Sequence, residues 1–193
     1  QLSSEIIANA DRLNRVVSNL LDMSRLSSGK LVLNRDWHDL SDLVSVTIDS
    51  QRSALANHAV SVRLADFLPL VRIDFQLLQQ SLANVLVNAA NYTPPNTSIE
   101  VGARIIDRVI ELSVSDHGPG FSPESIPHLF EMFYRVSGSK PGGAGIGLAI
   151  AKGIVELHGG TIQAENMATG GARFTIKLPV EPQPKGPQSG SET

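Results

Sequence analysis

Three asparagine side chains are spaced along one side of a predicted helix. Asn84, Asn88 and Asn91 stand at positions i, i+4 and i+7 of the segment 75–92, so at about 100° per residue they form one stripe. Amide oxygens are hard, neutral ligands that suit Mg²⁺, which few protein groups hold together with substrate phosphates. The alternative is a solvated polar face, although Glu and Lys are more usual there. By itself the stripe leaves both a magnesium–phosphate site and a solvated face open.

A carboxylate continues the apolar face of the predicted strand 109–116. Three apolar residues share that face: Ile110, Leu112 and Val114. Side chains alternate along a strand, so Asp116 points the same way, and a buried charge needs a partner. An amino group on a flat heterocycle would satisfy it, and Gly118 and Gly120 allow a ligand to approach closely. The alternative is an Asx turn at the end of the strand.

A glycine-rich stretch leads into the predicted helix 147–158. Gly143, Gly145 and Gly147 are spaced as Gly-x-Gly-x-Gly. Free N–H groups and the positive end of the dipole at a helix N-terminus attract anions. No Gly-Lys-Ser/Thr follows, so this is not a P-loop, and a loop rather than a strand precedes it, which argues against a dinucleotide fingerprint. The stretch predicts an anion site of another kind.

An aromatic segment lies between the two glycine motifs. Phe130 and Phe133 are three residues apart and are expected to anchor a short helix, with plain core packing an equal alternative. Arg135 follows where the flexible segment begins, and it could reach a phosphate. Glycine is frequent over 136–146, so we expect a mobile lid there.

The elements that position these residues form an α+β pattern. We expect helices at 40–57, 75–92 and 147–158, and strands at 31–35, 59–65, 70–73, 98–105, 109–116, 161–166 and 172–178. Asp74 is a predicted N-cap of the second of these helices, and Pro94 helps to end it. The strands come in adjacent pairs, which favours a mixed sheet with helices on one face.

The chain divides into three predicted parts. Residues 1–29 contain a long helix, 3–27, whose heptad-like seam requires a partner helix in a hairpin or dimer, unless it packs on its own domain. Residues 30–180 form the α+β domain. Residues 181–193 are rich in Pro, Gly and Ser, and we expect them to be disordered. The chain starts at Gln1 rather than Met, as expected for a piece of a longer protein.

The composition excludes several classes of protein. The chain has 193 residues, a net charge of −3 and no cysteine. A nucleic-acid binder would carry a large positive excess, and disulfides, thiolate catalysis and cysteine-based zinc sites all need cysteine. No run of about 18 apolar residues occurs, so we expect no membrane segment. The five histidines show no metal-ligand spacing, and no nucleophilic triad is readable.

The order of these motifs resembles the ATP-binding domain of bacterial sensor histidine kinases, in the superfamily shared with Hsp90, type II topoisomerases and MutL. The motifs are the Asn helix, Asp-x-Gly-x-Gly, Phe-x-x-Phe-x-Arg and Gly-x-Gly-x-Gly. The resemblance implies a Bergerat-type, two-layer α/β sandwich. The stretch from Arg12 to Leu26 looks like the second helix of the family's dimerisation and phosphotransfer domain. The phrase from Asn19 to Trp37 is most similar to potassium-sensing kinases of the KdpD type.

The resemblance also implies a set of residue roles. The nucleotide would be contacted by Asn84, Asn88, Asn91, Tyr92, Asp116, Gly118, Gly120, Arg135, Lys140, Gly143, Gly145, Ile146, Gly147 and Leu148. Among these, Asn84, Asn88 and Arg135 would be catalytic. Asn88 would ligate Mg²⁺, and Asp116 would accept from the adenine amino group. Tyr92 would lie against the adenine or ribose.

The implied activity is transfer of the ATP γ-phosphoryl group to a histidine, and then to an aspartate of a response regulator. The phosphoacceptor motif is absent from the chain, so it should lie upstream, and we expect no autophosphorylation on a histidine of this chain. The full-length protein would be a homodimer anchored in the bacterial inner membrane, with this part in the cytoplasm and no nucleic-acid partner.

Two departures from the family pattern leave alternatives open. Asn91 stands where many members carry a phosphate-contacting Lys, and Ala172 replaces a common Thr. An ATP-sensing pseudokinase, which binds without transfer, is one alternative. A serine kinase of the anti-sigma-factor type is another, although the helix 3–27 argues against it. A purely structural dimer module is the third, and the clustering of glycines argues against that.

Overall fold

The computed structural model describes residues 31–136 and 144–182, together with Val17, Leu21 and Ser24. These three isolated residues have helical backbone, and the rest of the predicted helix 3–27 lies outside the described residues. The same is true of most of the predicted lid and of the tail beyond Pro182. Within the described ranges, no helix combines the length and the apolar character that a membrane crossing requires.

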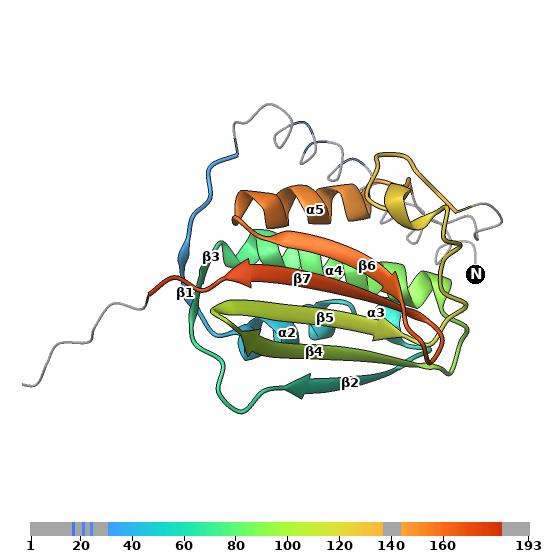
Figure 1. Cartoon of the computed structure of the whole chain (residues 1–193), viewed down its shortest axis with the longest axis horizontal. Coiled ribbons are helices and arrows are strands. Elements are labelled where there is room, and N and C mark those ends of the chain that lie inside the picture. The colour runs from blue at the N-terminus through green and yellow to red at the C-terminus, as the bar shows by residue number, and fades with distance from the viewer. Residues whose placement is uncertain (1–16, 18–20, 22–23, 25–30, 137–143, 183–193) are drawn as a thin grey trace, which may run out of the picture.

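A five-stranded mixed sheet forms one layer of the molecule (Figure 1). Its strands, in spatial order, are β2 (Ala59–Leu64), β4 (Ser98–Ile106), β5 (Val109–Asp116), β7 (Ala172–Pro179) and β6 (Thr161–Asn166). β2 runs parallel to β4, and the other neighbours are antiparallel. Two residues with positive φ, Asp107 and Arg108, join β4 to β5, as a tight hairpin turn demands. The predicted mixed sheet is confirmed.

The helices form the second layer, behind the sheet in Figure 1. They are α2 (Leu40–Ser50), α3 (Arg52–Leu55), α4 (Phe75–Tyr92) and α5 (Gly147–Leu157), with a 3₁₀ turn, η1 (Ile126–His128), beside them. The core between the layers is aliphatic, and it includes the predicted apolar face of α4, Leu78, Leu82, Val85, Leu86 and Ala89. Alternate residues of β5 are buried against it, so the predicted two-layer α+β fold is confirmed.

The predicted bounds of α4 are confirmed at both ends. Asp74 is its N-cap, and its Oδ1 accepts a hydrogen bond from the backbone N–H of Leu77 at 3.2 Å. Thr93 ends the helix in an extended conformation, because a residue before proline is disfavoured in the helical region. Strong local signals therefore fix the element that carries the asparagine stripe.

Two predicted elements are wrong. Residues 31–35 form no strand; the strand is β1 (Asp36–His38), which pairs antiparallel with β3 (Val71–Ile73) in a small second sheet. The segment 31–35 is held instead by polar contacts with distant parts of the chain, including the N–H of Asn34 bonded to Asp74 Oδ2 at 2.9 Å. The helix predicted over 40–57 breaks at Gln51, whose φ and ψ are −104° and 15°, and side-chain bonds to the preceding carbonyls compete with the regular ladder there.

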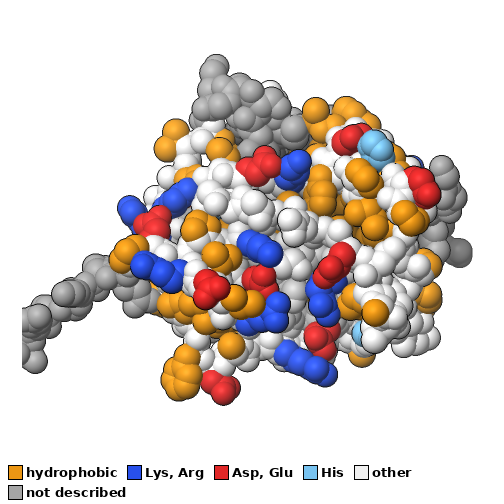
Figure 2. Space-filling view, in the orientation of Figure 1, with side chains coloured by type: hydrophobic (Ala, Val, Ile, Leu, Met, Phe, Trp, Pro, Cys, Tyr) orange, Lys and Arg blue, Asp and Glu red, His pale blue; other side chains and the backbone are white. Residues whose placement is uncertain are grey.

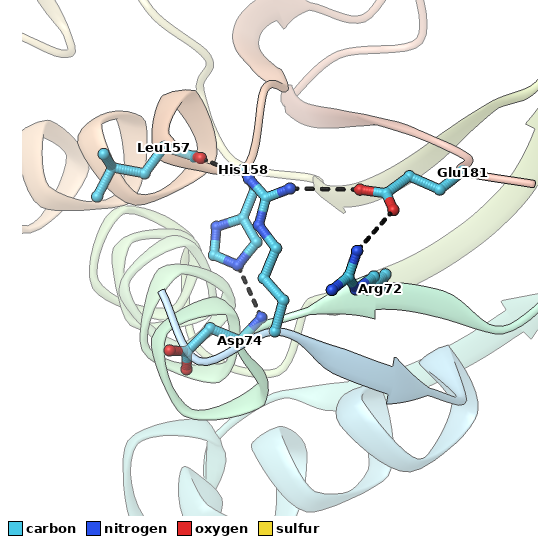
Figure 3. Close-up of polar contacts among 6 residues, drawn as sticks. Arg72, Asp74, Leu157, His158 and Glu181 are labelled. Atoms are coloured by element: carbon cyan, nitrogen blue, oxygen red, sulfur yellow. Dashed lines mark hydrogen bonds and ion pairs between the residues drawn. The ribbon is translucent and has the colours of Figure 1, made fainter. Parts of the chain in front are cut away.

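A polar cluster ties the two ends of the domain to α5 (Figure 3). Arg35 donates from Nη2 to the carbonyl oxygen of Leu157 at 2.8 Å, at the C-terminus of α5. Glu181 accepts from Arg35 and from Arg72, each at 3.4 Å. Glu181 is the first residue of the predicted disordered tail, so the ordered part of the domain extends at least to this residue.

Candidate nucleotide-binding site

The elements that carry most of the predicted site residues converge at one end of the molecule (Figure 1). β5 and α4 both finish there, α5 begins there, and the β6–β7 turn lies beside them. The antiparallel register brings the end of β5 next to the start of β7, with Ser115 opposite Arg173. The topology therefore gathers four motifs that are far apart in sequence.

Asp116 is 5% exposed, and its two carboxylate oxygens differ in their hydrogen bonds. Oδ1 accepts from the backbone N–H groups of Gly118 at 2.8 Å and Ala172 at 3.4 Å. Among the described residues, none donates to Oδ2. The Asx turn of the alternative reading is present and occupies one oxygen, and the ligand reading stays a prediction for the other. The other oxygen is left to accept from a ligand.

Glycines allow the backbone to close tightly around this carboxylate. A Cβ atom at Gly118 would lie 2.9 Å from Asp116 Oδ1 and 3.2 Å from the carbonyl oxygen of Tyr92. Gly120 has φ of +72°. Gly171 has φ of +86°, and a Cβ there would collide with the carbonyl of Asp116. Gly171 was not among the predicted site residues; its place after another glycine in a hairpin signalled a turn but not this contact.

The first residue of the asparagine stripe, Asn84, faces α5 rather than bulk solvent. Asn84 is half-buried, its Nδ2 is fully buried with no partner in the described structure, and its Oδ1 would lie 3.4 Å from a Cβ on Gly147. Asn88 is half-buried one turn later, and Asn91 is exposed. A wholly solvated face is therefore wrong for Asn84. Its unpartnered amide is free to bond to a ligand at the start of α5.

The N-terminus of α5 differs from those of α2 and α4. Asp39 and Asp74 cap α2 and α4 with side-chain bonds, but the cap of α5 is Ile146, which has no side-chain acceptor. The first N–H groups of a helix have no partner within the helix. They and the dipole end are consequently available for an anion.

Gly145 joins the start of α5 to the segment after η1. Its φ is +69°, and a Cβ there would lie 2.7 Å from the carbonyl oxygen of Tyr134. Its own carbonyl accepts from the N–H of Phe133 at 2.9 Å. The short helix expected around the phenylalanines is wrong, because η1 ends before Phe130 and the chain turns at Phe133 with φ of +65°. Phe130 packs edge-on against Phe174 in the core.

The remaining predicted residues are placed as follows. Tyr92 and Leu148 are half-buried, Ile146 is buried and Arg135 is exposed. Lys140 and Gly143 lie outside the described residues.

A hollow of about 770 Å³ lies away from this site, on the open face of the sheet. None of the predicted site residues lines it. Several charged side chains that line this hollow form ion pairs. Figure 2 shows acidic and basic side chains intermingled on this face. Glu111 pairs with Arg104 at 2.6 Å and Lys177 at 3.2 Å, and hydrogen bonds from both lower the pKa of Glu111. This network joins β4, β5 and β7.

Comparison of the sequence with known protein families identifies the family of this chain. Residues 73–182 match the family described as histidine kinase-, DNA gyrase B- and HSP90-like ATPase. The chain belongs to this family. The matched range contains every candidate site residue, from Asn84 to Leu148.

Individual relatives agree with this assignment. Sensor protein KdpD of Escherichia coli K12 is 35% identical over 186 residues, which are 95% of this chain and 20% of KdpD. The chain thus spans about a fifth of that relative. A mycobacterial sensor histidine kinase, MprB, superposes with a TM-score of 0.68 at 31% identity, over 77% of this chain and 99% of MprB. ShkA, solved in full length in complex with AMPPNP, superposes with a TM-score of 0.80 at 26% identity. The match covers 90% of this chain and 37% of ShkA. The fold is that of a histidine kinase ATP-binding catalytic domain.

Proposed function

We propose that this chain is the catalytic part of a two-component sensor kinase, which holds ATP for transfer of its γ-phosphoryl group to a histidine. The observation that carries the proposal is Asp116, a buried carboxylate with one oxygen fixed by two N–H groups and the other unused by the described residues. That arrangement matches the donor on the edge of adenine, and an isolated buried acceptor is otherwise costly. Family membership supports the same ligand.

The other candidate residues fit the rest of the nucleotide. The uncapped start of α5 and the unpartnered amide of Asn84 suit the phosphates. Asn88, one turn further along α4, would ligate Mg²⁺ between those phosphates. Tyr92 would lie against the adenine or ribose, and Arg135 would approach the phosphates. These groups bind, orient and neutralise charge, which is most of what phosphoryl transfer asks of a protein.

The partners follow from that chemistry. ATP supplies the phosphoryl group when it is bound. The phosphoacceptor histidine would belong to a helix upstream of Gln1, and the phosphoryl group would then pass to an aspartate of a response regulator. We further propose that the full-length protein is a homodimer held at the bacterial inner membrane, with this part in the cytoplasm. KdpD is its relative, and a potassium-linked stimulus is therefore the first to test.

An ATP-sensing pseudokinase is the second candidate. The observation that favours it is Asn91, which is exposed at the end of α4 and carries no charge for the phosphates. Supplying the missing phosphoacceptor helix in trans separates the two. Phosphate that is labile in acid on that helix supports the kinase, and binding without transfer supports the sensor.

The first test is calorimetric titration with AMPPNP, with and without Mg²⁺. We expect a micromolar dissociation constant. Asp116→Asn keeps an oxygen for the two N–H groups but turns the free acceptor into a donor that opposes the adenine amino group. Its affinity should fall at least about 100-fold. Asp66→Asn, at an exposed carboxylate in the β2–β3 connection, is the matched control and should bind normally. A folded wild-type chain that does not bind AMPPNP would overturn the proposal.

A further inference from the structure

Thr93 carries a buried hydroxyl that bonds to nothing in the described structure. The residue is 3% exposed, and its Oγ1 has no hydrogen-bond partner. Its backbone N–H is used, because it donates to the carbonyl of Ala89 at 3.0 Å at the end of α4. A buried hydroxyl without a partner opposes folding, and native structures contain few of them. The residue therefore needs an explanation other than stability.

The position of Thr93 connects it with Asp116. Gly118 lies between the two residues: a Cβ on Gly118 would lie 2.9 Å from Asp116 Oδ1 and 3.4 Å from the Cα of Thr93. The same Gly118 donates its N–H to that Oδ1. Thr93 and Asp116 thus flank one glycine on which no side chain fits, beside the carboxylate whose second oxygen, Oδ2, is left for a ligand.

The backbone of Thr93 is also held in place. Its φ and ψ are −94° and 138°, and Pro94 restricts it to this extended region. The hydroxyl is therefore presented from a fixed backbone rather than from a loose turn. A buried and unused donor on a fixed backbone is what a site needs in order to read a ligand.

We propose that the Thr93 hydroxyl is a second base-reading group, which donates to the ring nitrogen N1 of adenine, directly or through one water molecule. This rests on the proposed binding of ATP, and it adds a residue that was not among the predicted contacts. The adenine edge presents an amino donor beside the N1 acceptor. Asp116 Oδ2 accepts from the amino group, and Thr93 supplies the matching donor. Together the two side chains recognise both polar atoms of that edge.

Thr93→Val is the decisive variant, because valine has nearly the same shape and lacks only the hydroxyl. Removing an unsatisfied buried hydroxyl should leave the melting temperature of the nucleotide-free domain unchanged or raise it. The same change should weaken ADP binding about tenfold. Thr93→Ser keeps the hydroxyl and should bind within about threefold of wild type. A purely structural role would move stability and affinity in the same direction.

An ADP analogue without the N1 acceptor shows whether the hydroxyl of Thr93 bonds to N1. 1-Deaza-ADP replaces N1 by C–H, so wild type should bind it about tenfold more weakly than ADP, whereas Thr93→Val should bind the two nearly equally. If wild type binds both ligands alike, or if Thr93→Val keeps the full preference for ADP, the proposal is wrong. Equal binding of the two ligands by wild type would refute the proposal even if the valine variant fails to fold.

The outcome also separates this inference from the proposed function. Binding of ADP that is lost in Asp116→Asn but unaffected in Thr93→Val would refute the role of Thr93 alone. No ADP binding by the folded wild-type chain would refute both, since Thr93 would then have no base to read.

Discussion

The imidazole of His158 accepts a hydrogen bond at Nε2 from the backbone N–H of Asp74 at 3.0 Å (Figure 3). Its Nδ1 lies 2.8 Å from the carbonyl oxygen of Ile154. A backbone N–H can only donate, so the ring is neutral and carries its proton on Nδ1. One side chain that is 4% exposed thus links the end of α5 to the start of α4.

This arrangement predicts a loss of stability in mild acid. Burial lowers the pKa of His158 below its ordinary value near 6.5; the charge of Arg35 also lowers it, while the Ile154 carbonyl and Asp74 oppose the shift. The unfolded chain therefore binds a proton at a higher pH than the folded chain does. The free energy of unfolding should fall as the pH drops through about 6.5, by at most about 1.4 kcal/mol per pH unit, and level off below the folded pKa.

His158→Gln removes this titration while its amide can still accept at one atom and donate at the other. Urea unfolding between pH 8 and pH 5 should show a flatter profile for the variant than for wild type. His128→Gln, at an exposed histidine, is the control and should keep the slope of wild type. Equal slopes for all three proteins would show that His158 does not govern the acid sensitivity.

Asn166 holds the chain that leaves β5 just after Asp116. Its Oδ1 accepts from the N–H of Phe121 at 2.8 Å, and its Nδ2 donates to the carbonyl of the same residue at 2.7 Å. Gly120 precedes this residue, and a Cβ on it would lie 2.7 Å from Asn166 Oδ1. The β6–β7 hairpin therefore fixes the Gly118–Phe121 segment from one side.

Replacing Asn166 should weaken nucleotide binding more than it weakens the fold. Asn166→Ala removes two exposed hydrogen bonds and should lower the free energy of unfolding by about 1 kcal/mol. The freed segment should raise the AMPPNP dissociation constant about tenfold, because binding must then order it. Gln163→Ala, on the same strand, is the control. Normal AMPPNP affinity in folded Asn166→Ala would show that the clamp serves stability alone.

Local signals predicted the frame of this domain, and long-range contacts account for what they missed. The N-cap at Asp74 and the proline after Thr93 fixed both ends of α4, and strict alternation fixed β5 as far as Asp116. No local pattern marks the pairing of Asn166 with a residue 45 positions away. Thr93 was missed for a related reason, since burial without a partner is visible only once the fold is known.

Asn91 offers a gain of function. It is exposed in the last turn of α4, three residues after Asn88, where many related kinases carry a lysine that contacts phosphate. Asn91→Lys should tighten AMPPNP binding about three- to tenfold by adding a positive charge near the phosphates. The gain should shrink as salt is raised from 50 to 500 mM, because exposed charges are screened.

Two comparisons show whether that gain comes from the phosphate chain. AMP lacks the outer phosphates, so Asn91→Lys should change its affinity much less than that of AMPPNP. Gln76→Lys adds the same charge at an exposed position near the other end of α4, and it should change neither affinity. An equal gain for AMP and AMPPNP, or an equal gain in Gln76→Lys, would mean that net charge alone is responsible. If Asn91→Lys does not tighten AMPPNP binding, restoring the positive charge does not improve the site. That result would favour the nucleotide sensor over the kinase.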